Sequence, residues 1–231
     1  MTQCVITMRL IAVNRTATRH CHDARHSIAA PDGDGRRPEG NMLPVRIHGR
    51  GGQGVVSGAE VLAVAAFLEG RHAQAFPSFG SERMGAPVMA FCRIDDRPIR
   101  LREPVMEPDA LIIQDPTLLY QVDLFNGLSP TGTVLINSTR PLEELGLTAL
   151  LERTPNVRFF ALAATEIAMR HVGRPVPNMP LLAAFAGLTG LIGLESVVEA
   201  IRDKFPARLA EPNIAAAREA YEIAAKERAH A

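Results

Sequence analysis

The chain has few lysines and cysteines for its length. Of its 25 basic residues only Lys204 and Lys226 are lysines, and both fall in a segment with the pattern of a surface helix. Schiff-base chemistry, which needs a lysine amine, therefore has only these two candidates. The three cysteines, Cys4, Cys21 and Cys92, form no C-x-x-C pair, so we expect no iron–sulfur cluster or metal site in the chain itself. So few cysteines are also typical of the reducing cytoplasm.

Long apolar runs and an excess of one charge are missing as well. The longest apolar stretch, residues 179–194, is shorter than the roughly 18–20 residues that cross a bilayer, so we predict a buried or interface helix and no membrane partner. Acidic and basic residues balance at 25 each. Because nucleic-acid binding needs clustered positive charge, we expect no nucleic-acid partner. The N-terminus lacks the apolar region of a secretory signal, and we expect a cytoplasmic protein.

The first 41 residues differ in composition from the rest. They hold six Arg and three His and show no sustained helical or strand period. Such a segment buries too little apolar surface to offset its ordering entropy, so we predict a disordered extension over residues 1–41. His20-Cys21-His22 could bind a metal, but no further ligands follow at zinc-finger spacing. Met42 directly precedes the first patterned segment, which leaves open a start codon assigned too early. Residues 42–231 are predicted to form one domain.

From Leu43 onward, short apolar strands alternate with helical patterns. Val55–Glu69 repeats apolar residues at helical spacing, and Ala110–Ile113 is a fully apolar strand that ends before a proline. The predicted strands cover residues 45–48, 71–76, 88–94, 110–113, 133–136 and 157–160, and the predicted helices 55–69, 179–194, 195–205 and 211–229. This order predicts an α/β fold with a mostly parallel sheet, helices on both faces and a helical C-terminus.

A glycine-rich turn joins the first predicted strand to the first predicted helix. The segment His48-Gly-Arg-Gly-Gly-Gln-Gly54 contains G-x-G-x-x-G in the strand–turn–helix context of Rossmann-like folds. Glycines let the backbone come close to a ligand, and the following helix N-terminus offers free N–H groups to a phosphate. The turn is therefore a candidate phosphate or pyrophosphate site. The alternative is a tight turn that holds no ligand.

The sequence offers no catalytic constellation. It lacks G-x-S-x-G, the Walker G-K-[ST] and H-E-x-x-H. His48 and His72 are candidate acid–base groups, although a lone histidine at a strand end is more often structural, and Asp115 is more simply explained as a strand terminus. A nucleotide-dependent oxidoreductase is disfavoured, because Glu69 precedes the second strand, Glu82 lies well into the next loop, and neither stands where a ribose-binding acid is needed.

Two stretches are more specific than the glycine turn alone. The first is Gly49–Val56 with Ala59–Ala63 in the following helix, and the second is Ala73–Val88. Together they resemble the γ subunits of the pyruvate:ferredoxin and other 2-oxoacid:ferredoxin oxidoreductases. The likeness covers about residues 43–225 and continues through Phe91–Ile94, Pro98–Arg100, Pro108-Asp109, Asp115-Pro116, Asn137-Ser138, Pro177–Met179 and Asn213.

The resemblance implies a subunit that is inactive alone. In that family thiamine diphosphate lies between α and β chains, iron–sulfur clusters lie elsewhere, including a ferredoxin-like subunit, and ferredoxin or a similar acceptor takes the electrons. The γ portion helps to bind coenzyme A and completes the complex that converts a 2-oxoacid oxidatively to acyl-CoA. By resemblance, the residues that face the coenzyme A phosphates are Arg50, Gly51, Gly52, Gln53 and Gly54. The resemblance places no catalytic residue and no metal in this chain.

The loop after the second strand has an implied role at the partner surface near the active centre. Its expected residues there are Ser78, Phe79, Gly80, Glu82 and Arg83. Glu82 and Arg83 could instead form a structural ion pair with each other.

The same loop bears on the substrate. Residues 79–87 are similar to the pyruvate type, with Ser81 in place of a proline and Met84 in place of an arginine. The second change removes a fork-shaped donor, so aryl-glyoxylate or other 2-oxoacids remain alternatives to pyruvate. An assembly module whose glycine turn holds nothing is the remaining hypothesis.

Overall fold

The computed structural model describes residues 42–78 and 84–230. The predicted extension over residues 1–41 therefore lies outside the described residues. So do four of the expected partner-loop residues, Phe79, Gly80, Glu82 and Arg83. All of the described residues belong to one compact unit.

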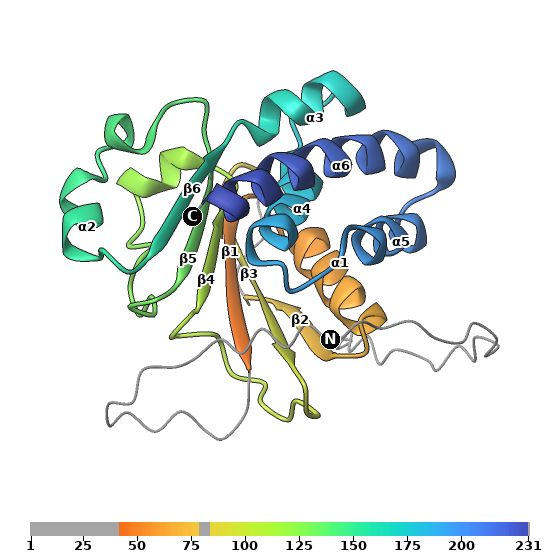
Figure 1. Ribbon diagram of the computed structural model, residues 1–231, viewed down its shortest axis with the longest axis horizontal. Coiled ribbons are helices and arrows are strands. Elements are labelled where there is room, and N and C mark those ends of the chain that lie inside the picture. Colours follow the sequence, from red (N-terminus) through yellow and green to blue (C-terminus); the bar gives the residue numbers. More distant parts are fainter. Residues whose placement is uncertain (1–41, 79–83, 231) are drawn as a thin grey trace. The chain divides into compact units, whose positions relative to one another are not determined.

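A six-stranded sheet forms the centre of this unit (Figure 1). Its strands are β1 (Leu43–Arg50), β2 (His72–Pro77), β3 (Pro87–Asp95), β4 (Ala110–Ile113), β5 (Thr133–Asn137) and β6 (Arg158–Leu162), in the order β2-β3-β1-β4-β5-β6. β1, β4, β5 and β6 pair in parallel, whereas β3 pairs antiparallel with both β1 and β2. β2 thus runs in the direction of β1, and only β3 is reversed. The predicted mostly parallel sheet is confirmed.

The place of β3 departs from a simple Rossmann order. β3 enters between β1 and β2, so the helix that follows β1 leads to a strand two places away. A parallel connection needs a crossover of a dozen or more residues. The connection between β2 and β3 is only residues 78–86, which is long enough for an antiparallel return and too short for a crossover helix.

Helices cover both faces of the sheet, as predicted (Figure 1). One face carries α1 (Val55–Leu68), α3 (Ala164–Val172), α4 (Asn178–Thr189), α5 (Leu194–Lys204) and α6 (Ala207–His230), and the other carries η1 (Pro116–Tyr120), η2 (Leu142–Leu145) and α2 (Thr148–Arg153). Alternate strand residues serve the two cores. Ile112 packs in the core under α1, whereas Leu111 and Ile113 pack in the core under η1 and α2.

Most of the longest apolar run, predicted as a helix over residues 179–194, forms α4, which ends earlier, at Thr189, and is buried over almost its whole length. It is covered by α6, and the two approach so closely that a Cβ on Gly187 would lie 2.5 Å from the Tyr221 carbonyl oxygen. No helix in the described part of the chain has the length and apolarity for a membrane crossing.

The C-terminal helix begins earlier than its pattern predicts. The sequence indicated residues 211–229, but α6 begins at Ala207 and continues through Pro212. Pro212 has no N–H to donate within the helix, and the next residue, Asn213, donates from its side chain to the Leu209 carbonyl one turn earlier (2.8 Å).

Candidate functional site

The carboxyl ends of the parallel strands β1, β4 and β5 lie side by side at the same end of the sheet. The chain leaves β1 for α1 on one face and leaves β4 for η1 on the other face. The point between such strands is a topological switch point, where open α/β sheets bind ligands. The glycine turn that follows β1 lies at this point.

The N-terminus of α1 has no side-chain cap. Gly54 is the N-cap, in the left-handed region at φ 72°, and the first turn contains no acidic residue. Within residues 42–78 and 84–230, no backbone acceptor pairs with the N–H groups of Gly52 and Gly54. Among these residues, therefore, no side-chain cap and no first-turn acid neutralises the positive end of the helix dipole.

Two glycines of the turn have backbone conformations that favour glycine. Gly52 lies at φ 96° and Gly54 at φ 72°. A Cβ on Gly54 would also lie 2.3 Å from Asn178 Nδ2. That amide, at the start of α4, donates a hydrogen bond to the Gly54 carbonyl (3.2 Å) and so holds the turn from the α4 side.

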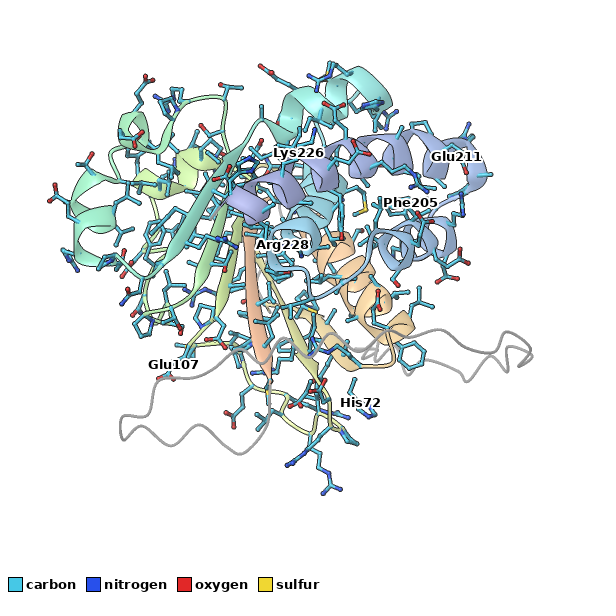
Figure 2. The ribbon with its side chains drawn as sticks, in the orientation of Figure 1. His72, Glu107, Phe205, Glu211, Lys226 and Arg228 are labelled. Carbon is cyan, nitrogen blue, oxygen red and sulfur yellow. The ribbon has the colours of Figure 1, made fainter. Side chains whose placement is uncertain are left out.

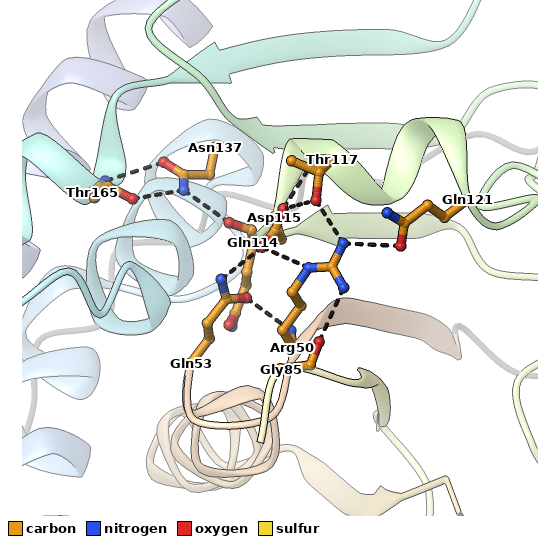
Figure 3. A network of polar contacts seen from close by, with 9 residues as sticks. All are labelled: Arg50, Gln53, Gly85, Gln114, Asp115, Thr117, Gln121, Asn137 and Thr165. Atoms are coloured by element: carbon orange, nitrogen blue, oxygen red, sulfur yellow. Dashed lines mark hydrogen bonds and ion pairs between the residues drawn. The ribbon is translucent and has the colours of Figure 1, made fainter. Parts of the chain in front are cut away.

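Arg50, the last residue of β1, makes the densest set of contacts at the site (Figure 3). Its Nε donates to Asp115 Oδ2 (3.1 Å), one terminal nitrogen to the Gly85 carbonyl (3.0 Å), and the other to Thr117 Oγ1 (2.7 Å) and Gln121 Oε1 (2.9 Å). Four of the five guanidinium N–H donors are thus engaged. We expected this side chain to face a phosphate, and that role stays a prediction.

Gln53 and Asp115 complete the contact between the turn and the end of β4. The Gln53 side-chain nitrogen donates to Asp115 Oδ2 (2.9 Å). The Gln53 side-chain oxygen accepts from the backbone N–H of Arg50 (2.8 Å). Burial opposes ionisation of Asp115, but hydrogen bonds from Thr117 and Gln53 and the charge of Arg50 outweigh it. The pKa of this carboxyl consequently lies below its usual value.

The segment that leads into β3 folds back onto the glycine turn. The Gly51 N–H donates to the Ala86 carbonyl (2.9 Å), and the Gly85 N–H donates to the Gly51 carbonyl (3.2 Å). The Met84 side chain is 86% exposed and lies against Gly52, where an added Cβ would be 3.0 Å from its methyl carbon. Among the expected loop residues, Ser78 is described; its N–H pairs with the Met89 carbonyl within the β2–β3 hairpin.

A second polar cluster continues along the same end of the sheet (Figure 3). The Asn137 amide donates to the Gln114 carbonyl and to Thr165 Oγ1, both at 2.8 Å, and accepts from the Thr165 N–H (3.1 Å). Gln114 is buried, and its Oε1 has no hydrogen-bond partner in the part of the chain that the structure describes. Nothing in the sequence pattern of Gln114 and Thr165 indicated that they would lie at this site.

The candidate acid–base groups are not brought together. His48 is buried on the sheet face opposite Ile47, and burial together with the Arg46 charge lowers its pKa to about 4. His72 is the first residue of β2 and therefore lies at the amino end of that strand, away from the glycine turn; Figure 2 labels it there. Within the described residues, no three His, Cys, Asp or Glu side chains are grouped to hold a metal ion.

The fold and the glycine turn together define a class of protein. A doubly wound sheet with a glycine turn and an uncapped helix at its switch point is typical of α/β proteins that bind phosphate-bearing ligands. Residues 44–223 match the family described as pyruvate ferredoxin/flavodoxin oxidoreductase. The chain belongs to this family, as a subunit of an oxidoreductase that acts on 2-oxoacids.

Individual relatives agree with this assignment. The chain is 49% identical over 181 residues to the common γ subunit of the pyruvate/ketoisovalerate oxidoreductases of Pyrococcus furiosus, which covers 78% of this chain and 96% of the relative. The crystal structure of pyruvate oxidoreductase subunit PORC from Thermotoga maritima has a TM-score of 0.67 and 36% identity, over 78% of this chain and 96% of that one.

A more distant structure shares the fold. The 2-oxoglutarate:ferredoxin oxidoreductase of Magnetococcus marinus, solved with 2-oxoglutarate, coenzyme A and succinyl-CoA bound, has a TM-score of 0.63 at 19% identity. It covers 80% of this chain, and the match occupies 31% of that much longer chain.

Proposed function

We propose that this chain is the γ subunit of a pyruvate:ferredoxin oxidoreductase and that its glycine turn, residues 50–54, binds the phosphates of coenzyme A. Thiamine diphosphate and the iron–sulfur clusters belong, in this proposal, to α, β and ferredoxin-like partner subunits. The observation that carries the proposal is the uncapped N-terminus of α1, with its glycine N-cap and no acid in the first turn. Pyruvate is the proposed substrate because the names of both similar subunits include it.

The chemistry of the turn supports an anion as the ligand. Free N–H groups at a helix N-terminus and the dipole behind them attract negative charge, and each charge-assisted hydrogen bond is worth about 1.5–3 kcal/mol. A phosphate at Gly52 and Gly54 would give acceptors to N–H groups that have no backbone acceptor among the described residues. The backbone thus supplies the contacts, since the Gln53 amide is engaged with Asp115 and four of the five Arg50 donors already have acceptors within the chain.

A dinucleotide fits the same geometry less well. Glu69, the acid nearest to the second strand in the sequence, uses Oε1 to accept hydrogen bonds from the Gly193 N–H (2.8 Å) and Ser196 Oγ (2.7 Å). These contacts join the end of α1 to the start of α5. Glu69 is thereby committed away from the position of a ribose-binding carboxylate.

Ser57→Asp tests the proposal in the assembled complex. Ser57 is the third residue of α1, where a carboxylate stabilises the helix dipole by about 0.3–1 kcal/mol but repels a bound phosphate. We expect the KM for coenzyme A to rise about tenfold, equivalent to about 1.4 kcal/mol, while the free energy of unfolding stays equal or rises. The reduction of the complex by pyruvate, a step that precedes the need for coenzyme A, should change much less.

Ser57→Asn is the matched control, because it has nearly the same size and no charge. We expect it to keep the KM for coenzyme A within about twofold of the parent, less than about 0.5 kcal/mol. If the assembled Ser57→Asp complex showed unchanged coenzyme A kinetics, the phosphate site would be ruled out, and the chain would be an assembly module with an empty turn.

A further inference from the structure

Arg50 connects three segments that are far apart in the sequence. Arg50 is the last residue of β1. Its partner Asp115 lies 65 positions later, after β4, and the Gly85 carbonyl belongs to the segment before β3. Figure 3 shows the guanidinium between these segments. The side chain therefore bridges the glycine turn to both of its neighbours in the sheet.

The bridge is partly shielded from solvent and is reinforced from the turn. The side chains of Arg50 and Asp115 are 22% and 14% exposed. Asp115 Oδ2 accepts from both Arg50 and Gln53, while its Oδ1 accepts from the Thr117 N–H (3.0 Å). A planar fork with several fixed donors suits such a site better than a lysine amine does.

The segment before β3 is held by the backbone as well as by Arg50. Gly51 exchanges hydrogen bonds with Ala86 and Gly85, and Met84 lies over Gly52. The Gly85 carbonyl accepts from Arg50. Any displacement of the Arg50 side chain would therefore be transmitted to both sides of the turn.

We propose that Arg50, paired with Asp115, is a positioning residue that holds the glycine turn, the end of β4 and the segment Met84–Ala86 as one unit. Its positive charge is balanced by the Asp115 carboxylate, and four of its donors are taken. Arg50 thus acts on the ligand through the turn that it fixes and is not itself the main phosphate contact. The effect on coenzyme A rests on the proposed function above, whereas the effect on the turn does not.

Arg50→Lys in the assembled complex tests the positioning role directly. Lysine keeps the charge but cannot reach four acceptors in a plane. We expect the hydrogen-bonded amides of Gly51 and Gly85 to exchange with solvent at least about tenfold faster, as measured by hydrogen–deuterium exchange of peptides that cover residues 49–56 and 84–90. The KM for coenzyme A should rise about fivefold or more, while kcat at saturating coenzyme A stays within about twofold.

Arg71→Lys is the control. Arg71 also donates from Nε to an aspartate oxygen at 3.1 Å, that of Asp96, near the start of β2. The control should leave exchange in both peptides and the coenzyme A kinetics unchanged. In a double-mutant cycle, Arg50→Lys with Asp115→Asn should loosen the turn little more than either change alone, because both remove the same bridge.

The outcomes separate the two proposals. Faster exchange with a raised KM supports both the positioning role and coenzyme A binding at the turn. Faster exchange with unchanged coenzyme A kinetics keeps the positioning role and overturns the coenzyme A assignment. Unchanged exchange at Gly51 and Gly85, or a loss of kcat without a change in KM, overturns the positioning role.

Discussion

At the scale of single residues, the end of β1 shows how burial and charge decide what a side chain can do. Arg46, His48 and Arg50 are alternate residues of one strand, so they lie on one side of the sheet. Arg46 donates to the carbonyls of Leu124 (2.8 Å) and Asn126 (2.7 Å), which fixes its charge under the covering loops. Burial, reinforced by this neighbouring charge, lowers the pKa of His48 to about 4, so its imidazole is neutral at pH 7 and serves the packing of the sheet instead of acid–base chemistry.

The buried His48 should make the stability of the full chain sensitive to mild acid. Its pKa is lowered to about 4 in the folded protein by burial and by Arg46, against about 6.5 in an unfolded chain. As the pH falls from 6.5 toward 4, the unfolded state takes up a proton that the folded state does not, so stability is lost across this window. The shift corresponds to about 3 kcal/mol.

His48→Gln should remove this part of the acid sensitivity. We expect the difference in unfolding free energy between parent and variant, measured by urea titration at pH 7 and pH 4.5, to move in favour of the variant at the lower pH. Carboxylates titrate in both proteins and cancel in the difference. If the difference in unfolding free energy between the two proteins were the same at both pH values, His48 would be protonated at pH 4.5 in the folded state as well as in the unfolded state.

At the scale of elements, helix contacts depend on whether a glycine has room for a side chain. Gly187 in α4 and Gly58 in α1 are both interior helix positions. A Cβ on Gly187 would meet the Tyr221 carbonyl oxygen of α6 at 2.5 Å, whereas one on Gly58 would meet the Gln114 amide nitrogen at 3.6 Å, an ordinary contact. The same substitution should therefore have opposite effects in the two helices.

Gly187→Ala should lower the free energy of unfolding by about 2–3 kcal/mol, because α4 and α6 must move apart. Gly58→Ala should raise it by about 0.5–1 kcal/mol, because alanine restricts the unfolded chain and favours the helix. Both values come from urea unfolding of the full chain. A tolerated alanine at Gly187 would mean that α6 packs more loosely on α4 than the structure has it.

At the scale of the whole molecule, the first strand and the family match begin within one residue of each other. The first strand, β1, starts at Leu43, and the family match starts at residue 44. The composition of residues 1–41 predicts that they add no core. The proposal that residues 1–41 are not needed for folding or assembly does not depend on the proposals about the glycine turn.

A chain that starts at Met42 should fold and assemble like the full chain. We expect its melting temperature to stay within about 2 °C, since a loss of 1 kcal/mol would shift it by about 2–4 °C in a domain of this size. Gel filtration with the co-expressed partner subunits checks assembly. A melting temperature lowered by more than about 5 °C, or failure to assemble, would contradict the prediction.

The sequence by itself determined the local elements and the location of the glycine turn. Apolar periodicity predicted Val55–Glu69 as a helix and Ala110–Ile113 as a strand, within one residue of the observed α1 and β4, because burial of one face leaves apolar residues at fixed spacing. The short helix α3 (Ala164–Val172) was missed, and the start of α6 was placed too late. A proline in the first turns of a helix is read as a boundary, because it has no N–H for the helical ladder.

Tertiary structure alone decided how the turn is held. The pairing of Arg50 with Asp115 joins residues 65 positions apart, and Asp115 next to a proline looked like an ordinary strand end. The insertion of β3 beside β1 brought Gly85 against the same guanidinium. Contacts of this kind leave no periodic signal in the sequence, because they depend on which strands become neighbours. That choice is made by the packing of the whole sheet.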